Sequence, residues 1–295
     1  MADTPIIDRA FLEKLERLTL HWSRSFPGLV GGHNSSRFPG AGQEFLDHRH
    51  FHQGDDLRAV NWRAYLRLEK LFLKLFQVEP RVPVRLLIDA STSMGTGSEG
   101  SKFDFARRLA AALCYVGLVR LDTICIQPFS GTLSEAYICS GGRHRFVGAA
   151  EFLGRIELQG RTAFLEIARE FVAAYSQRGL VIVLSDFLDD DDPEKPLEYL
   201  AEFGHELLLV HLWAPEDREP PWDGELDLTD AETGRRLEIA FDEGARERYT
   251  AAFDRFSRGL QQLAERHRGR YVGLPCNTTL EEAMFGPLAR VGALQ

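Results

Sequence analysis

Short apolar runs alternate with amphipathic segments over most of the chain. Continuous apolar stretches lie at Val84–Ala90, Leu180–Leu188 and Leu207–Trp213. Buried strands of a parallel sheet have this pattern, because both faces of the sheet are covered. Between them, apolar residues recur at helical spacing, as in Phe103–Leu118. This alternation predicts an α/β fold with a doubly wound, mostly parallel sheet.

The pattern also places the individual elements. Strands are predicted over Val82–Asp89, Thr123–Phe129, Glu135–Cys139, Leu180–Asp186, Glu206–Trp213 and Tyr271–Leu274, with a hairpin formed by Glu225–Leu228 and Arg236–Phe241. Helices are predicted over Phe103–Leu118, Phe146–Arg155, Ala163–Gln177, Pro193–Phe203, Ala245–His267 and Thr279–Ala289, the last with a capping box formed by Thr278 and Glu281.

The first part of the chain has a different texture. A helix is predicted after Asp8, and residues 27–42 are too rich in Gly, Ser and Arg for a regular element. The segment 71–76 could be a strand or a short helix. We therefore expect a smaller block with a helix and short strands over residues 1–80, followed by the α/β domain over residues 81–295.

Carboxylates and hydroxyls follow the predicted strands. Asp89 ends one strand and Ser91 and Ser93 follow it, while Asp186 ends a second strand. Thr162 precedes a predicted helix. Ligands of doubly wound folds bind outside the carboxyl ends of the strands, and oxygen ligands suit a hard cation such as Mg²⁺, Mn²⁺ or Ca²⁺. Each residue alone could simply cap a helix or start a turn, but their joint occurrence predicts a metal site.

These residues carry a resemblance to a known fold family. Asp89-x-Ser91-x-Ser93, with the later Thr162 and Asp186, resembles the metal-ion-dependent adhesion site of von Willebrand factor A domains. The resemblance implies a divalent cation that accepts a carboxylate from a partner protein. Thr162 is the weaker match, because Gly160-Arg161-Thr162 departs from the Gly-Gly-Thr usual in that family.

The N-terminal region extends the resemblance. Residues 32–35, 40–45 and the run Gly54-Asp55-Asp56-Leu57-Arg58-x-x-Asn61-Trp62-Arg63-Ala64-Tyr65 are similar to the signature of the bacterial domain of unknown function 58 family. A turn of the form Asp-x-Glu-Thr-Gly near residue 234 also recurs there. Asn61 and Phe51 depart from the family's usual Asp and Tyr. The resemblance implies a non-enzymatic binding protein that works beside MoxR-type AAA+ ATPases in assembly, maturation or remodelling of other proteins.

The signature run itself has two interpretations. Opposite charges alternate along it, with aromatic residues between them. It is either a salt-bridge network that locks the N-terminal block in place or a surface that docks a partner. The candidate partner-binding residues are Asp55, Asp56, Arg58, Trp62, Arg63 and Tyr65.

Composition narrows the possible functions. The 35 Lys and Arg against 44 Asp and Glu give a net charge of −9, which disfavours nucleic acid as a partner. No apolar run approaches the roughly 20 residues of a membrane span. The four cysteines form no C-x-x-C pair, so we expect buried, reduced thiols and a cytoplasmic location.

Two rival sites stay open. A strand-end Asp with Mg²⁺ is also the layout of phosphohydrolases, although Ser91 stands where such enzymes commonly have a second Asp, and Lys102 is the nearest lysine. His48, His50 and His52 would share one face of a strand and could bind zinc, with His33 or Asp47 completing the set. The acidic run at 189–192 is either a solvated loop or a source of negative potential at the site.

Overall fold

The computed structural model describes residues 6–21, 36–39, 44–52, 60–78, 83–97, 101–189 and 193–295. It divides into two compact units. One unit comprises Met1–Trp22 with Pro83–Gln295, and the other comprises Ser23–Val82. Each unit is described by itself.

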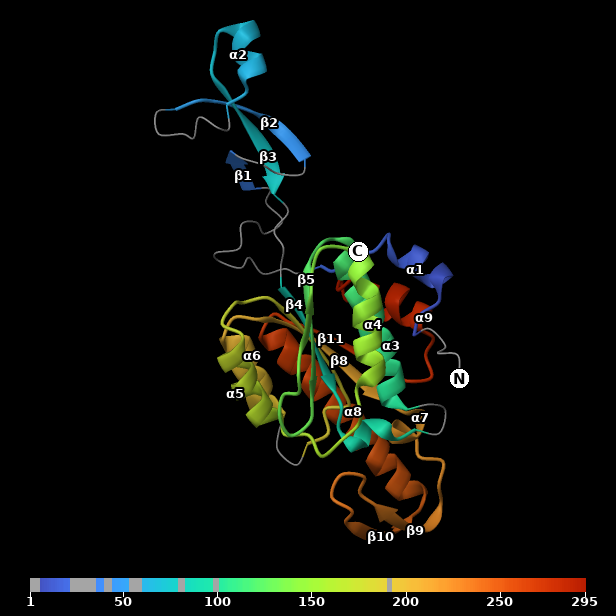
Figure 1. Ribbon diagram of the computed structural model, residues 1–295. Helices are drawn as coiled ribbons and strands as arrows, with labels where there is room; N and C mark the ends of the chain where they lie inside the picture. Colours follow the sequence, from blue (N-terminus) through green and yellow to red (C-terminus); the bar gives the residue numbers. More distant parts are fainter. Residues whose placement is uncertain are drawn as a thin grey trace. The chain divides into compact units, whose positions relative to one another are not determined.

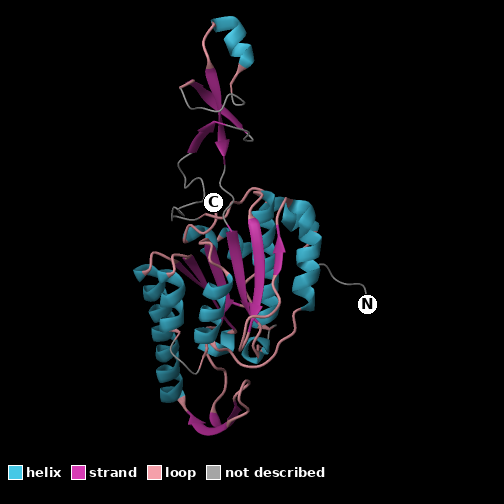
Figure 2. Cartoon of the chain, turned by 60° about the vertical axis from the view of Figure 1, so that its left-hand side comes forward, coloured by secondary structure: helices cyan, strands magenta, loops and turns pink. Residues whose placement is uncertain are grey.

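The described part of the larger unit is built around a six-stranded sheet (Figures 1 and 2). In order across the sheet its strands are β11 (Arg270–Pro275), β8 (Glu206–Trp213), β7 (Leu180–Ser185), β4 (Pro83–Asp89), β5 (Thr123–Phe129) and β6 (Tyr137–Cys139). All neighbouring pairs are parallel except β5 with β6, which is antiparallel. The predicted α/β fold with a mostly parallel, doubly wound sheet is confirmed.

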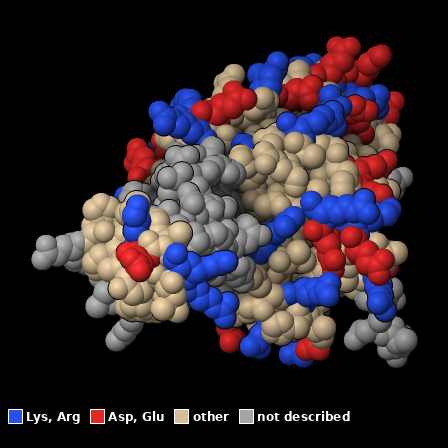
Figure 3. All heavy atoms as spheres, turned by 90° about the horizontal axis from the view of Figure 1, so that it is seen from above, with Lys and Arg blue, Asp and Glu red and all other residues tan. Residues whose placement is uncertain are grey.

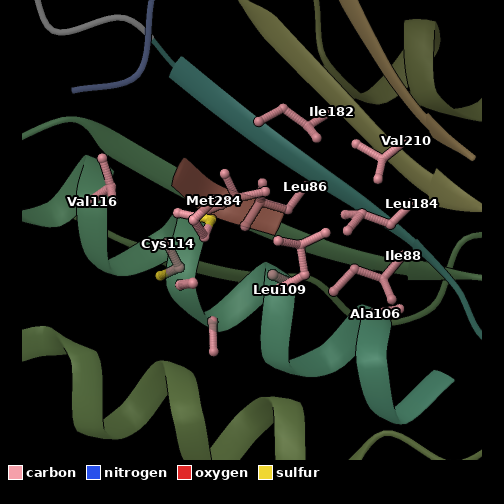
Figure 4. Packing of buried hydrophobic residues seen from close by; sticks show 14 of the residues in the cluster. Leu86, Ile88, Ala106, Leu109, Cys114, Val116, Ile182, Leu184, Val210 and Met284 are labelled. Carbon is pink, nitrogen blue, oxygen red and sulfur yellow. The ribbon is translucent and has the colours of Figure 1, made fainter. Parts of the chain in front are cut away.

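Helices cover both faces of this sheet. One face packs against α1 (Arg9–Leu15), α3 (Lys102–Val119), α4 (Phe146–Arg155), α9 (Leu280–Phe285) and α10 (Pro287–Arg290). The other packs against α5 (Phe164–Ala174), α6 (Glu194–Glu202) and α8 (Glu243–Arg266). Strand alternation divides the side chains of β4 between these layers. Leu86 and Ile88 face α3, where they pack near Leu109 (Figure 4). Leu87 belongs to the other layer.

The strand order fixes where a ligand can bind. The chain runs from β4 through α3 to β5 on one side, and later returns to β7 on the other side of β4. The connections therefore diverge at β4, and the carboxyl ends of β4 and β7 border the switch point. In doubly wound sheets this position is where ligands bind.

The first helix belongs to the α/β unit. Phe11 and Leu15 of α1 are buried in the core beside α3, and Thr19 and Gln295 exchange backbone hydrogen bonds of 2.7 and 3.0 Å. Arg270 Nη1 donates to the carbonyl oxygen of His21 at 2.8 Å. Contacts distant in sequence thus join residues 6–21 to the larger unit, whereas the sequence analysis assigned them to the N-terminal block.

Element bounds differ from the predicted ones by a few residues, and the C-terminal helix and the segment at 71–76 need comment. The helix predicted over Thr279–Ala289 is two helices, α9 and α10, separated at Gly286. The first begins one residue later than predicted, with a capping box formed by Thr279 and Glu282. The ambiguous segment at 71–76 is a strand, β3 (Phe72–Val78), which pairs with two antiparallel neighbours. Strand pairing across the unit decides this assignment, since an apolar run of this length fits either element.

The smaller unit combines strands and a helix. In its described part, β1 (Ser36–Pro39), β3 and β2 (Glu44–His50) form an antiparallel sheet in that order. The helix α2 (Trp62–Leu68) precedes β3, and Asn61 caps it by accepting a hydrogen bond from the Ala64 N–H at 3.3 Å.

A separate hairpin projects from the larger unit. Strands β9 (Gly224–Thr229) and β10 (Arg236–Phe241) pair only with each other in the described structure. Figures 1 and 2 place them at the end of the sheet where β4 and β7 finish. The predicted hairpin is confirmed.

The structure shows the state of the cysteines and the distribution of charged side chains. The four cysteines are free and buried, as expected. Lys and Arg are interspersed with Asp and Glu over the described part of the face in Figure 3.

No helix among the described residues is both long enough and apolar enough to cross a bilayer.

Truncation of Leu109 tests the packing of α3 on the sheet. We expect Leu109→Ala to lower the free energy of unfolding by about 2–5 kcal/mol, because this side chain is fully buried against β4. Urea denaturation measures the change. The matched control is Leu237→Ala on the hairpin, where the side chain is 59% exposed. A change within about 0.5 kcal/mol is expected there, and equal losses in both variants would contradict this account of the core.

Candidate metal centre at the strand ends

Asp89 is the buried centre of the candidate site. It is the last residue of β4, and its side chain has no solvent exposure. Its Oδ1 accepts a hydrogen bond from the Ser91 N–H at 2.9 Å, and its Oδ2 accepts one from Ser185 Oγ at 2.5 Å. The carboxylate is therefore held in one orientation by a residue of the neighbouring strand β7 and by the turn after β4.

Three hydroxyl groups surround this carboxylate. Ser91 Oγ and Ser93 Oγ lie 3.0 Å apart at the start of the short 3₁₀ helix after β4. Thr162 Oγ1 lies 3.4 Å from both carboxylate oxygens of Asp89. The predicted grouping of Asp89, Ser91, Ser93 and Thr162 is therefore present in the structure.

The loop before α5 brings Thr162 to the site. The carbonyl oxygen of Gly160 accepts hydrogen bonds from Thr92 N and Thr92 Oγ1 at 3.0 and 2.7 Å, and Gln159 N donates to Ala90 O at 2.8 Å. Gly160 has φ of +67°, which costs other residues backbone strain. The glycine of Gly-Arg-Thr is thus needed for the turn that ties this loop to the end of β4.

Asp186 is also at the site, but it is paired with a lysine. Lys102 Nζ lies 2.7 Å from Asp186 Oδ2 and 3.3 Å from Asp217 Oδ2. Lys102 and Asp186 are each only 2% exposed. Burial lowers the pKa of Lys102, but the two carboxylates outweigh it, so the pKa is raised and the ammonium stays charged.

The charges at the site are not balanced. Burial raises the pKa of Asp89 to about 7, and repulsion by the Asp186 carboxylate adds to this effect. The Lys102 ammonium pairs with the carboxylates of Asp186 and Asp217, and the Asp89 carboxylate beside Asp186 has no cationic partner among the described residues. A second cation would relieve this repulsion.

The donor set fits a small hard cation. Two buried carboxylates and three hydroxyls converge at Asp89, and oxygen ligands are what Mg²⁺, Mn²⁺ and Ca²⁺ prefer. No group of three or more His, Cys, Asp or Glu side chains in the described ranges is arranged as a metal cage. A cation here would therefore depend on hydroxyl and water ligands as well as on carboxylates.

A further carboxylate approaches from the hairpin. Glu232, in the turn between β9 and β10, accepts a hydrogen bond from the Thr162 N–H at 3.4 Å. Burial raises the pKa of Glu232, while hydroxyl groups of Ser93 and Ser91 act in the opposite direction. The sequence analysis noted this turn motif but gave it no role.

The sequence analysis also missed three contributors. Ser185, which holds Asp89, directly precedes the predicted Asp186, so its place at a strand end was a usable signal. Asp217 follows β8, the next strand in the sheet. Lys102 was noted only as the nearest lysine, because sequence spacing does not show that the start of α3 lies beside Asp186.

The acidic run at 189–192 is described only at its first residue. Asp189 Oδ2 accepts a hydrogen bond from the Phe164 N–H at 2.9 Å, at the start of α5. A carboxylate at a helix N-terminus satisfies an otherwise unpaired N–H group. Asp189 thus has a structural role, and the remainder of the run lies outside the described residues.

The signature run of the smaller unit is described only in part. Trp62, Arg63 and Tyr65 lie on α2, which has no buried residue, and all three are exposed. Asp55, Asp56 and Arg58 lie outside the described residues. Asn61 caps α2, and the Asp usual in the resembled family would serve the same purpose, so this departure leaves the local structure unchanged.

The histidine site gains no support. His50 and His52 are exposed, and the described residues hold no cluster of three metal-binding side chains. His33 and the side chain of His48 lie outside the description.

Comparison with known proteins identifies the family. Residues 47–258 match the family described as "Protein of unknown function DUF58", which covers more than half of the chain. The chain belongs to this family. The family resemblance stated from the sequence motifs is confirmed.

Relatives and solved structures show similar proteins. An uncharacterized protein of Mycobacterium tuberculosis is 25% identical over 251 residues, covering 84% of this chain and 79% of the relative. Protein BatB of Bacteroides thetaiotaomicron, a conserved hypothetical protein, aligns with a TM-score of 0.45 and 20% identity over 72% of this chain and 98% of its own. The SpRpn10 VWA domain aligns with a TM-score of 0.39 and 12% identity over 69% and 93%.

Removal of the Lys102 ammonium tests the buried ion pair. We expect Lys102→Met, measured in EDTA, to lower the free energy of unfolding by about 3–5 kcal/mol, because Asp186 then stays buried without its partner. Lys195→Met on the exposed face of α6 is the control and should change stability by less than about 0.5 kcal/mol. A similarly small effect at Lys102 would show that the pair contributes little.

Proposed function

We propose that this DUF58 protein is a non-enzymatic, metal-dependent protein-binding module. The supporting observation is the buried carboxylate of Asp89, surrounded by the hydroxyls of Ser91, Ser93 and Thr162. Such a site, at the switch point of a doubly wound sheet, suits a cation that binds an external ligand.

The metal would be Mg²⁺, with Mn²⁺ or Ca²⁺ as substitutes. Asp89, Ser91, Ser93, Thr162 and Asp186 would hold it, some of them through water, as is usual for Mg²⁺. The bound ion would supply a positive charge that attracts a carboxylate. The protein keeps the hydroxyls in place through Gly160 and fixes Asp89 through Ser185.

The partner would be a MoxR-type AAA+ ATPase that donates an acidic side chain. This part of the proposal rests on the family resemblance. The exposed aromatic residues of α2, Trp62 and Tyr65, offer a second contact surface of the kind that forms interface hot spots. Together with Arg63, and with Asp55, Asp56 and Arg58 earlier in the sequence, they remain the candidate docking residues.

Buried free thiols fit a reducing compartment, so we place this activity in the cytoplasm.

A phosphohydrolase is less well supported. Its chemistry would need a cation that clamps the phosphate, but Lys102 is 2% exposed and engaged by Asp186 and Asp217. The residue two positions after Asp89 is Ser91, which hydrogen-bonds to Ser93. The geometry therefore favours ligand binding over phosphoryl transfer.

Replacement of Asp89 by Asn tests the metal site. We expect Asp89→Asn to weaken Mg²⁺ binding by at least about tenfold in isothermal titration calorimetry, because the central anionic ligand is lost. Ser93→Ala, at a half-buried position, should weaken it less. Glu247→Gln on the exposed face of α8 is the carboxylate-to-amide control and should bind Mg²⁺ like the wild type.

The partner is tested with the same variants. Purified MoxR-type ATPase should bind the wild type in Mg²⁺, but not in EDTA, and should not bind Asp89→Asn under either condition. Equal binding by all forms would contradict a metal-dependent interface and would move the docking role to the smaller unit. Phosphoester turnover that disappears in Asp89→Asn would favour the hydrolase.

A further inference from the structure

The strands of the β9–β10 hairpin bury little surface, so the hairpin is stabilised mainly through its turn and its base. Every residue of β9 is exposed apart from Leu226, and β10 is buried only at Phe241. An isolated two-stranded hairpin is marginally stable in water. The contacts at its two ends therefore decide where it rests.

The turn of the hairpin is rigidly built. Asp230 Oδ1 accepts hydrogen bonds from the N–H groups of Glu232 and Thr233, at 3.0 and 2.5 Å, and from Thr233 Oγ1 at 2.7 Å. Gly234 takes φ of +69° and donates its N–H to Asp230 O at 3.0 Å. This geometry fixes the backbone from which the Glu232 side chain extends.

Glu232 directs its carboxylate to the candidate metal site. Its Oε2 accepts the Thr162 N–H at 3.4 Å. Its Oε1 is buried and has no hydrogen-bond partner within the described part of the chain. A buried carboxylate oxygen without a partner is costly. The hydroxyls of Ser93 and Ser91 lie beside the Glu232 carboxylate, and the Asp186 carboxylate is near enough to repel it. A cation at this point would satisfy the free oxygen and relieve that repulsion.

We propose that Glu232 is an internal ligand of this site, which occupies the position of a partner's carboxylate until a partner displaces the hairpin turn. This inference rests on the proposed function, because it assumes a cation held at Asp89. It goes further by assigning a regulatory role to the hairpin. In the absence of a partner, Glu232 would occupy the free coordination position of the metal. Acidic groups on other proteins could then bind the metal only by displacing Glu232.

Displacement would be inexpensive because the hairpin is weakly held. Its remaining attachments are at the base, where Arg246 lies over the Phe241 ring at 5.8 Å and donates to Trp222 O at 2.6 Å. A partner's carboxylate would then compete with Glu232 for the cation. The apparent affinity for the partner then equals its affinity for the open site multiplied by the fraction of molecules in which the turn is released.

The experiment uses the full chain with Mn²⁺ as the metal and acetate as the carboxylate probe. Water-proton relaxation reports how many waters remain on bound Mn²⁺, and its titration gives the Mn²⁺ affinity. The variants are Glu232→Gln and Glu232→Ala. The control is Glu238→Gln, an exposed carboxylate on the same hairpin.

We expect both Glu232 variants to weaken Mn²⁺ binding by about tenfold and to increase the hydration of the bound ion. Acetate should then displace water from Mn²⁺ at lower concentration than in the wild type. Glu238→Gln should match the wild type in all three measurements. In a binding assay with the purified ATPase, the Glu232 variants should bind more tightly at saturating Mg²⁺.

Two negative results are distinguishable. In the first, the wild type binds Mn²⁺ and both Glu232 variants have the same Mn²⁺ affinity, metal hydration and acetate response as the wild type. The assignment of Glu232 as an internal ligand is then wrong, while the proposed metal-dependent function stands. If the wild type binds no divalent cation at all, the proposed function fails and this inference fails with it. Circular dichroism of each variant confirms that the fold is retained.

Discussion

The buried pair of Lys102 with Asp186 allows acidic groups to gather at the end of this sheet. Carboxylates at the ends of β4 and β7 are fully enclosed, and two such charges side by side would repel each other strongly. The ammonium at the start of α3 offsets part of this repulsion. Burial raises the pKa of Asp89, and repulsion by the Asp186 carboxylate adds to this effect. A second cation at this position would relieve the remaining repulsion.

The rest of the α/β unit places these groups. Hydrophobic layers on both faces hold β4 and β7 side by side, so Asp89 and Asp186 end at the same edge. Ser185 then crosses from β7 to Asp89, and the turn at Gly160 brings Thr162 over it. The packing of the core therefore determines the geometry of the candidate site. Without the parallel pairing of β4 with β7, the side-chain oxygens of these residues would not lie close together.

The hairpin and the helix α2 of the smaller unit are exposed elements available for contact with other molecules. The hairpin buries little apolar area and is anchored by its turn at the site, which suits an element that moves when a ligand arrives. In the smaller unit, α2 buries none of its residues and exposes Trp62 and Tyr65. Among the described residues, these two aromatic side chains of α2 are therefore available for contact with another molecule.

The sequence alone determined the fold class and pointed to the candidate site residues. Apolar periodicity predicts which residues are buried, and position at a strand end marks an Asp followed by alternating hydroxyls. The candidate residues predicted in this way were Asp89, Ser91, Ser93, Thr162 and Asp186, and the structure places them at one edge of the sheet. Only the tertiary structure decided that Lys102 neutralises Asp186, that Glu232 reaches Thr162 and that α1 joins the larger unit. These contacts join residues far apart along the chain, and local pattern carries no information about which distant side chains meet.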